Sequence, residues 1–449
     1  MGKLFGTDGV RGPVYQYPLT EKTVEQIGFA VAGFFRKASH HPRILIGMDT
    51  RISGPVFEKA LVSGIRASGG DALLAGVIPT PGIAYLTRSL QADAGIVISA
   101  SHNPFSDNGI KIFSGDGFKL PDETESKIET MIAAAEVING SPSNKPQNGK
   151  IPLPDAGEQY KDFLKRIFPS DLSLKGMKLV LDCANGATYR IAPETFRALG
   201  ADVVSFSDRP DGKNINDNCG SQHPEHIASE VARRGAVAGF AFDGDGDRVI
   251  AVDEKGNILT GDRTMVICAN AMKKRGCLAN NVVVTTIMSN LGLRIALKDL
   301  GIDSRITAVG DRYVLDEMRR SGASIGGEDS GHLIFMEKNT TGDGILTALQ
   351  LLEAKLESGK SLSELAGIMT VFPQRLTNIA VRSKPDISTV PAIVEAIAEA
   401  EAALGDRGRV LVRYSGTENL CRVMVEGPTD EETERHSRQI ADAIRKSLA

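Results

Sequence analysis

The sequence predicts an α/β protein with several domains, in which buried strands alternate with helices. Short apolar runs, such as RILIGMD (43–49), AGIVISA (94–100) and AVAGFAFD (236–243), are separated by longer amphipathic stretches, and this alternation is typical of βαβ units. Within these runs apolar residues scarcely alternate with polar ones, so both faces of each strand are expected to lie under helices. The chain has 449 residues, which is too long for a single hydrophobic core.

Two loop-like stretches and one Asp-rich segment divide the chain. Residues 138–157 are rich in Gly, Pro, Asn and Ser, where stable elements are not expected. A second break lies near 367–385, and the segment around and after it reads as strand, helix, strand, strand and helix, a small α+β arrangement. The long middle part is divided just after the Asp-rich segment. We therefore expect three similar α/β domains with mixed sheets at 1–148, 149–252 and 253–367, followed by a smaller α+β domain at 368–449.

Composition excludes several classes of partner. The net charge is -4, with 41% apolar and 24% charged residues, so no basic surface is available for nucleic acid or an anionic membrane. No stretch approaches the roughly 18 apolar residues of a membrane span, and the start MGKLFGTDGV lacks the apolar core of a signal peptide. We therefore expect a cytoplasmic protein. The five cysteines are scattered and never in CxxC spacing, which indicates neither a disulfide framework nor a zinc site.

The strongest local signal is FDGDGDRV (242–249), in which Asp243, Asp245 and Asp247 alternate with glycines after an apolar run. Crowded carboxylates repel one another unless a cation lies among them, and oxygen ligands favour Mg²⁺ or Ca²⁺. An EF-hand calcium loop needs glycine at its sixth position, where this chain has Arg248. We therefore predict a Mg²⁺ site, with a metal-free polar turn as the alternative.

A second signal is the loop ISASHNP (98–104), in which a fully apolar strand runs into Ser99, Ser101 and His102, with Lys111 further on. The loop does not match the GxSxG elbow of hydrolases, and no order typical of an acyl-transfer triad is evident. A serine that carries phosphate fits better. Taken alone, the loop would more often be an ordinary Ser/Asn turn.

Two further loops offer groups that bind hydroxyls and anions. GGEDSGH (326–332) contains Glu328, Asp329, Ser330 and His332, and a solvated turn explains it equally well. RYSGTENLCR (413–422) is expected to be a phosphate cradle, with a hairpin turn as the alternative. Its candidate ligands are Arg413, Ser415, Gly416, Thr417 and Arg422.

Two arginines stand among Gly, Thr and Asp near the start of the chain. They are Arg11 in FGTDGVRG and Arg51 in DTRISG, and either would steady a phosphate or the serine loop. As exposed, salt-bridged arginines they would look much the same.

Taken in this order, GTDGVRG, ISASHNP, DGDGDR, GGEDSGH and SGTE resemble the motifs of the α-D-phosphohexomutase superfamily, and the likeness spans the whole chain. The resemblance implies four domains around a central cleft. It also implies a reversible exchange of phosphate between O6 and O1 of a hexose, through a bisphosphorylated sugar that turns over inside the cleft. Ser101 would be the phosphoserine carrier, and Mg²⁺ would be bound by the phosphoserine together with Asp243, Asp245 and Asp247.

The resemblance also implies roles for the remaining loops. Glu328 and Ser330 would hold sugar hydroxyls, and the 413–422 loop would hold the phosphate that is not reacting. Arg11, Arg248 and Lys111 would stabilise the moving phosphoryl group, with His332 and His102 as competing acid or base candidates. Two residues depart from the family pattern: Asp329 replaces the usual glutamine or methionine, and Asn419 replaces a proline. Asp329 is a candidate partner for the C2 ammonium of an amino sugar.

The expected substrate is a hexosamine phosphate, namely glucosamine 6-phosphate converted to glucosamine 1-phosphate on the route to UDP-N-acetylglucosamine. A hexose 1,6-bisphosphate would serve as activator and intermediate, and a homodimer is expected because related enzymes are often dimers. Two alternatives stay open. One is a mutase for mannose or glucose phosphates, since these sugars differ at one or two ring substituents. The other is a sugar-phosphate or calcium-binding module without turnover.

Overall fold

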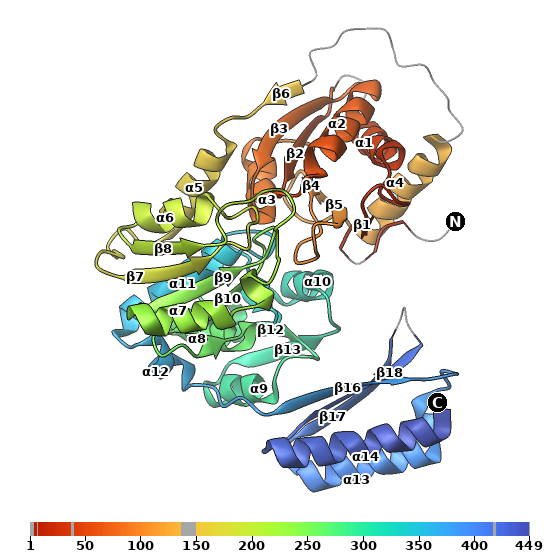
Figure 1. The fold of residues 1–449 in the computed structure, drawn as a ribbon, viewed down its shortest axis with the longest axis vertical. Coiled ribbons are helices and arrows are strands. Elements are labelled where there is room, and N and C mark those ends of the chain that lie inside the picture. Colours follow the sequence, from red (N-terminus) through yellow and green to blue (C-terminus); the bar gives the residue numbers. More distant parts are fainter. Residues whose placement is uncertain (1–3, 7, 37–39, 136–149, 416–418, 449) are drawn as a thin grey trace. The chain divides into compact units, whose positions relative to one another are not determined.

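The computed structural model describes residues 4–6, 8–36, 40–135, 150–415 and 419–448. These residues form two compact units. The first unit comprises Met1–Ile287 and Asp303–Gly367, and the second comprises Met288–Ile302 and Ile368–Ala449. Figure 1 shows three sheets within the first unit, each accompanied by helices, and one smaller sheet within the second.

The first sheet has six strands in the order β1-β5-β4-β2-β3-β6. The strands β6, β3, β2 and β4 run parallel, while β5 runs antiparallel to β4 and β1. Helices α1, α2 and α4 bury their apolar sides against this sheet, as the apolar runs require. The bounds are Val10–Pro13 (β1), Glu21–Phe35 (α1), Arg43–Met48 (β2), Gly54–Ala67 (α2), Asp71–Val77 (β3), Thr80–Ser89 (α3), Ala94–Ile98 (β4), Asp107–Ser114 (β5), Asp122–Ala135 (α4) and Lys150–Pro152 (β6).

The second sheet has five strands in the order β11-β10-β9-β7-β8. Here β8, β7 and β9 are parallel and β10 and β11 are antiparallel additions. The bounds are Ala156–Ile167 (α5), Lys178–Asp182 (β7), Ile191–Ala198 (α6), Asp202–Phe206 (β8), Gly220–Gln222 (η1), Glu225–Arg234 (α7), Ala238–Phe242 (β9), Val249–Asp253 (β10) and Ile258–Leu259 (β11).

The third sheet has four strands in the order β13-β12-β14-β15, with only β15 antiparallel. Its elements are Gly261–Lys274 (α8), Ala279–Asn281 (η2), Val282–Thr286 (β12), Asp303–Thr307 (β13), Asp311–Ser321 (α10), Ile325–Gly327 (β14), Leu333–Phe335 (β15), Gly344–Ser358 (α11) and Leu362–Ala366 (α12). All three sheets are therefore mixed and covered by helices, which confirms the predicted α/β class.

The second unit contains an antiparallel sheet in the order β16-β18-β17, with a core built from the sheet and two helices. The bounds are Leu291–Asp299 (α9), Gln374–Ala380 (β16), Ile387–Thr389 (η3), Pro391–Leu404 (α13), Gly405–Arg407 (η4), Arg409–Tyr414 (β17), Leu420–Glu426 (β18) and Asp430–Leu448 (α14). The order β16, α13, β17, β18, α14 confirms the predicted α+β segment.

The exact domain boundaries stay a prediction, and two short strands lie beyond them. β6 joins the first sheet past residue 148, and β11 extends the second sheet past residue 252. Strands of three and two residues are too short to show a hydrophobic period.

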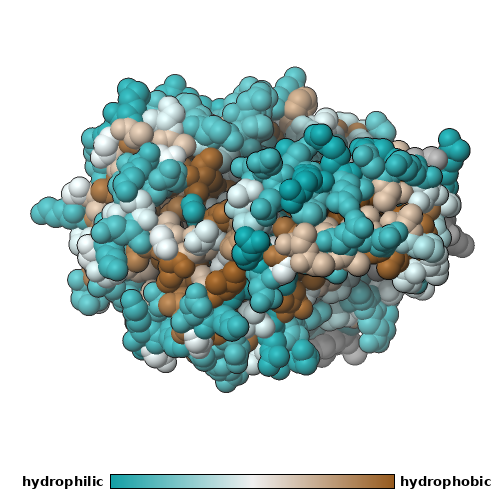
Figure 2. All heavy atoms as spheres, turned by 90° about the horizontal axis from the view of Figure 1, so that it is seen from below, coloured by the Kyte–Doolittle hydropathy of each residue, from teal (hydrophilic) through white to brown (hydrophobic). Residues whose placement is uncertain are grey.

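The described residues contain no helix long and apolar enough to cross a membrane. On the face drawn in Figure 2, hydrophilic residues predominate and apolar residues form small areas between them.

Candidate active site

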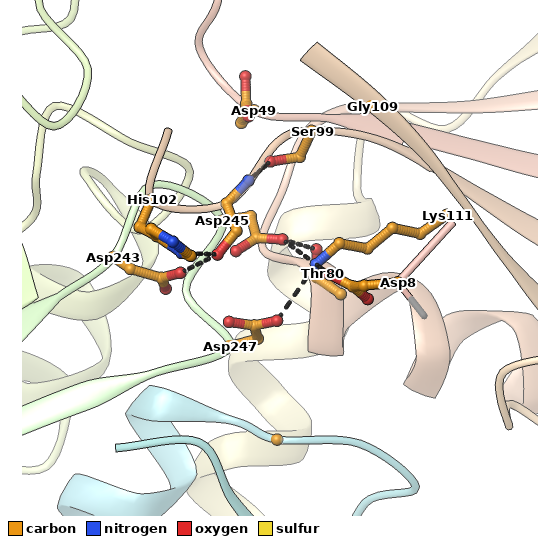
Figure 3. A network of polar contacts seen from close by, with 12 residues as sticks. Asp8, Asp49, Thr80, Ser99, His102, Gly109, Lys111, Asp243, Asp245 and Asp247 are labelled. Atoms are coloured by element: carbon orange, nitrogen blue, oxygen red, sulfur yellow. Dashed lines mark hydrogen bonds and ion pairs between the residues drawn. The ribbon is translucent and has the colours of Figure 1, made fainter. Parts of the chain in front are cut away.

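Loops at the ends of two strands bring the serine and the aspartates together. The serine loop (99–106) follows β4, and the Asp-rich loop (243–248) follows β9. Both strands are apolar and fully buried, so the polar residues after them are held at fixed positions at the sheet edges. Figure 3 shows the side chains that meet there.

Ser101 lies at the centre of this meeting point. Its side chain is 1% exposed, and its Oγ donates to Asp243 Oδ2 at 2.5 Å. Its backbone N–H donates to Ser99 Oγ at 2.9 Å, and its φ of 53° is left-handed. For a residue other than glycine this conformation costs about 1–3 kcal/mol. The contacts around Ser101 therefore hold its backbone in an unfavourable conformation, which fixes the direction of the side chain.

The three aspartates form one buried group. Their exposed fractions are 0%, 1% and 3%, and one oxygen from each lies within 4.8 Å of the others. Asp243 Oδ1 accepts the Arg248 backbone N–H at 3.2 Å. The Oδ1 atoms of Asp245 and Asp247 have no hydrogen-bond partner among the described residues. Asp247 Oδ1 lies 3.8 Å from Arg248 Nε, as an ion pair. Buried carboxylate oxygens without hydrogen bonds, beside a third carboxylate and a serine oxygen, suit a hard divalent cation such as Mg²⁺.

Lys111 supplies the positive charge that the structure itself places in this group. Its Nζ lies 2.9 Å from Asp245 Oδ2, 3.2 Å from Asp247 Oδ2 and 3.3 Å from Asp8 Oδ2, and Figure 3 shows it pointing from β5 toward these carboxylates. Burial disfavours the charge, yet the three carboxylates raise the pKa of Lys111 well above its usual range. Lys111 therefore remains a cation and is a poor acceptor for a proton.

The charge of the aspartates is divided unevenly. Burial, together with Asp247 and Asp245, raises the pKa of Asp243. Burial also opposes ionisation of Asp247, but Lys111 and His332 hold its pKa well below the usual range. A bound divalent cation would favour the ionised form of all three.

The two candidate histidines lie in different surroundings. His102 is half-buried, with Nδ1 3.3 Å from Ser101 Oγ, and burial together with Arg248 and Arg11 lowers its pKa to about 4. His332 is 2% exposed, with Nδ1 3.6 Å from Asp247 Oδ2. Asp247 raises the pKa of His332 against the effect of burial, whereas the Gly342 N–H that donates to Nε2 at 3.2 Å favours the neutral ring. We assign the His332 proton to Nδ1.

Several charged and polar residues at this site were not predicted from the sequence. Asp8 pairs with Arg11, Lys111 and Lys119, and Lys119 also pairs with Asp311 at the start of α10. Thr80 Oγ1 donates to Asp245 Oδ2 at 2.7 Å. Asp8 lies in the same motif as Arg11, FGTDGVRG, and this proximity in the sequence was the signal that could have indicated Asp8 as a site residue.

Comparison with known proteins assigns the family. Four family models match in chain order, described as phosphoglucomutase/phosphomannomutase α/β/α domains I, II and III and C-terminal domain, over residues 2–138, 158–256, 260–372 and 376–443. The chain belongs to this family of phosphohexose mutases. It is 61% identical to phosphoglucosamine mutase of Syntrophus aciditrophicus and 55% identical to that of Syntrophobacter fumaroxidans, each over 100% of both chains.

Solved structures agree at the level of the fold. A phosphoglucomutase/phosphomannomutase family protein from Burkholderia thailandensis has a TM-score of 0.79 at 24% identity, over 99% of this chain and 97% of that one. N-acetylphosphoglucosamine mutase from Aspergillus fumigatus, solved with GlcNAc-6P and magnesium, has a TM-score of 0.66 at 17% identity, over 99% and 96%.

In this phosphohexose mutase the GGEDSGH motif (326–332) covers the end of β14 and the loop 328–332 that connects β14 to β15. Glu328 Oε1 accepts the Gly310 N–H at 2.9 Å, and Asp329 Oδ1 accepts the Asp262 N–H at 3.3 Å near the start of α8. Ser330 is exposed. His332 is thus the member of this motif whose side chain contacts the aspartate group, through Asp247.

The predicted phosphate loop lies in the second unit of the mutase. Arg413 on β17 stands directly opposite Arg422 on β18, and both are half-buried. Lys384 Nζ donates to the carbonyl oxygen of Ser415 at 2.9 Å. Like charges placed opposite each other destabilise a sheet, so this pair suits an anionic ligand. Gly416 and Thr417 lie outside the described residues.

Proposed function

We propose that this chain is a phosphoglucosamine mutase, which interconverts glucosamine 6-phosphate and glucosamine 1-phosphate on the route to UDP-N-acetylglucosamine. The observation that carries the proposal is the position of Ser101, whose Oγ lies 2.5 Å from Asp243 in a group of three buried aspartates. A phosphate on this oxygen would lie beside a divalent cation and Lys111, as phosphoryl transfer requires.

Ser101 carries the phosphate, and Asp243, Asp245 and Asp247 would hold Mg²⁺ together with a phosphoserine oxygen. When bound, Mg²⁺ neutralises negative charge on the phosphoryl oxygens. Lys111 keeps its proton and balances the carboxylates, while Arg11 and Arg248 stabilise the charge that develops during transfer.

In the first transfer, a free hydroxyl oxygen of the sugar phosphate forms a bond to phosphorus and the bond from phosphorus to Ser101 Oγ breaks. The hydroxyl proton passes by way of His102, whose neutral ring faces the serine, to the Ser101 Oγ that is released, and the product is a bisphosphorylated sugar. In the second transfer, Ser101 Oγ forms a bond to the other phosphorus and the bond from that phosphorus to its sugar oxygen breaks. The serine proton passes by way of His102 to the sugar oxygen that is released. The enzyme is phosphorylated again, and the net change is movement of phosphate from one end of the sugar to the other.

The sugar must turn by about half a rotation between the two transfers, because the same serine reacts with both ends. Arg413, Ser415 and Arg422, with Gly416 and Thr417, hold the phosphate that is not reacting. Glu328 and Ser330 hold sugar hydroxyls. Support for glucosamine comes from the relatives named phosphoglucosamine mutase, and Asp329 adds a carboxylate for the C2 ammonium.

The test is a coupled mutase assay with Mg²⁺ on the phosphates of glucosamine, glucose and mannose, with glucose 1,6-bisphosphate as activator. We expect the fastest turnover on glucosamine phosphate. Ser101→Ala should abolish turnover, whereas Ser106→Ala should retain it, because Ser106 is exposed in the same loop. Intact-mass analysis should find one phosphate on the wild type and none on Ser101→Ala.

Each other result contradicts a distinct part of the proposal. Faster turnover on mannose or glucose phosphate would keep the mechanism and change the substrate. Undiminished activity in Ser101→Ala would refute the serine carrier. A wild-type protein that never takes up phosphate from a sugar bisphosphate would be a binding module without turnover.

A further inference from the structure

The backbone of the serine loop is held by two side chains from different parts of the first unit. The carbonyl oxygens of Ser101 and Asn103 each accept from the Arg51 guanidinium, at 3.2 and 2.5 Å. The same two oxygens each accept from Asn216 Nδ2, at 2.9 Å in both cases. Both hydrogens of one amide and both hydrogens of one guanidinium nitrogen are thereby directed at the same two carbonyls.

Arg51 and Asn216 reach these carbonyls from loops of two different sheets. Arg51 is 1% exposed, pairs with Asp49 and lies in the loop after β2 of the first sheet, and the serine loop follows β4 of the same sheet. Asn216 belongs to the loop that follows β8 of the second sheet. Its backbone is left-handed, with φ 58°, and its N–H donates to the Ala184 carbonyl at 2.9 Å. Asparagine tolerates this conformation better than most residues, so the loop presents the amide in a fixed direction.

The Asp-rich loop (243–248), called the metal loop below, packs against the Ser101 carbonyl and the Asn216 amide. A β-carbon at Gly244 would lie 2.5 Å from the Ser101 carbonyl oxygen and 2.7 Å from Asn216 Nδ2. The carbonyl of Gly244 in turn accepts the Ala187 N–H at 2.8 Å. Only glycine fits between the serine and Asn216, so a shift of the serine loop cannot occur without moving Gly244, which separates Asp243 from Asp245.

We propose that Asn216 is a positioning residue for phosphoryl transfer, which fixes the serine loop against the metal loop so that the Ser101 oxygen points at Asp243. The inference rests on the proposed role of Ser101 as the phosphate carrier. Asn216 acts through the carbonyls of Ser101 and Asn103, to which its amide donates. Arg51 holds the loop within its own sheet, and Asn216 supplies the hold from the second sheet, where the metal ligands lie.

The test compares Asn216→Gly with Asn218→Gly. Both asparagines are in the same loop and both have a left-handed backbone, with φ 58° and 51°, so glycine relieves strain equally at each. Asn218 is exposed, and its amide bonds only the adjacent Asp217 among the contacts described. Asn216→Asp is the second variant, because it keeps the shape but replaces the donors with a carboxylate oxygen that the two carbonyls repel.

Two readouts separate positioning from general stability. The first is the single-turnover rate at which glucose 1,6-bisphosphate phosphorylates Ser101, followed by intact mass. We expect Asn216→Gly and Asn216→Asp to lower this rate and kcat about 10- to 100-fold, as expected for a misplaced reacting group, with KM within about twofold. The second is phosphorus NMR, in which the phosphoserine resonance should shift or broaden in both Asn216 variants. Asn218→Gly should match the wild type in both.

Three outcomes would overturn the inference. Phosphorylation of Ser101 at the wild-type rate in Asn216→Gly, with a fully active wild type, would refute positioning and leave the proposed function intact. Equal losses of rate and melting temperature in Asn216→Gly and Asn218→Gly would assign the loop a structural role only. A wild type that takes up no phosphate on Ser101 would remove both the proposed function and this inference.

Discussion

The mutase carries two charged regions that are built in opposite ways. The serine site in the first unit combines three aspartates that are 0%, 1% and 3% exposed with a buried lysine. The arginine pair in the second unit, Arg413 and Arg422, stands on two neighbouring strands and is half-buried. The first region sets carboxylates against buried cations in a fixed environment, and the second sets two like charges opposite each other on half-buried side chains.

This difference matches the two tasks proposed for these regions. Transfer of a phosphoryl group needs fixed distances and low water content, because electrostatic stabilisation is strongest where charges are preorganised and buried. Holding the other phosphate requires repeated binding and release, for which a partly solvated cationic pair is better suited. The buried region should therefore respond to substitution mainly through stability and chemistry, and the open region mainly through affinity.

The largest expected effect is that of Lys111→Met. It removes the cation that lies beside Asp8, Asp245 and Asp247, and breaking a buried pair costs about 3–5 kcal/mol. The metal-free variant should melt well below the wild type, and added Mg²⁺ should raise its melting temperature more than that of the wild type. Lys127→Met is the control, because its pair with Glu123 is exposed and contributes little. Equal Mg²⁺ responses in Lys111→Met and the wild type would contradict the buried-charge argument.

A second effect of about 3 kcal/mol is expected from Asp343, which begins α11. Burial raises its pKa from 3.8 to about 6, and the next residue, Gly344, donates its N–H to the Gly246 carbonyl in the metal loop. In the unfolded chain the carboxyl ionises first, so stability is full below about pH 4 and falls as pH rises to about 6. Unfolding free energies measured by denaturant between about pH 4 and pH 6 should fall in the wild type, and this fall should be absent in Asp343→Asn.

An exposed carboxyl in the second unit supplies the control for this pH dependence. Asp386 is exposed in the second unit, and a hydrogen bond from Ser388 lowers its pKa, so its contribution is lost as pH falls rather than as it rises. Asp386→Asn should therefore change the slope of the unfolding free energy against pH only slightly, and in the opposite sense to Asp343→Asn. The same slope in Asp343→Asn and the wild type would contradict the role of the buried carboxyl.

The two regions also differ in how far the sequence predicts them. The β9 run followed by FDGDGDRV predicts a strand, a turn and a metal site, because hydrophobic runs and glycine spacing are local properties. Arg413 and Arg422 were predicted from the motif RYSGTENLCR as part of a phosphate cradle, with a hairpin turn as the alternative. The strand register that places Arg413 opposite Arg422 depends on pairing across the sheet, and no local pattern gives it.

Residues that support the serine site are harder to predict for the same reason. Thr80, Lys119 and Asn216 contact Asp245, Asp311 and the serine loop from distant segments, and single-sequence patterns carry no information on such long-range contacts. The expected role of Lys111, to stabilise a moving phosphoryl group, requires a cation, and the three surrounding carboxylates raise its pKa so that it stays one. Charge state depends on burial, which only the fold determines.

A third prediction concerns the open region itself. Arg413→Ala should raise KM for the sugar phosphate about 10- to 100-fold, since a charged hydrogen bond contributes about 1.5–3 kcal/mol. The melting temperature should not fall, because the substitution also removes repulsion from Arg422. Arg375→Ala is the matched control on β16, where the arginine pairs with Glu434 at the surface. A loss of kcat with unchanged KM in Arg413→Ala would place this arginine with the chemistry and would break the division between the two regions.

The smallest effect is expected at Asp329, in the loop 328–332 of the first unit. Its side chain is half-buried, so its exposure is greater than that of the three aspartates of the serine site. One of its oxygens accepts the Asp262 N–H, and an asparagine oxygen can replace it there, so Asp329→Asn should preserve the start of α8 and the melting temperature. What the variant loses is a negative charge for the C2 ammonium, worth about 0.2–1 kcal/mol for a solvated pair. The ratio of kcat/KM on glucosamine phosphate to that on glucose phosphate should therefore fall by up to about fivefold. An unchanged ratio would exclude Asp329 from sugar discrimination and would leave its carboxylate as a contact of the α8 start alone.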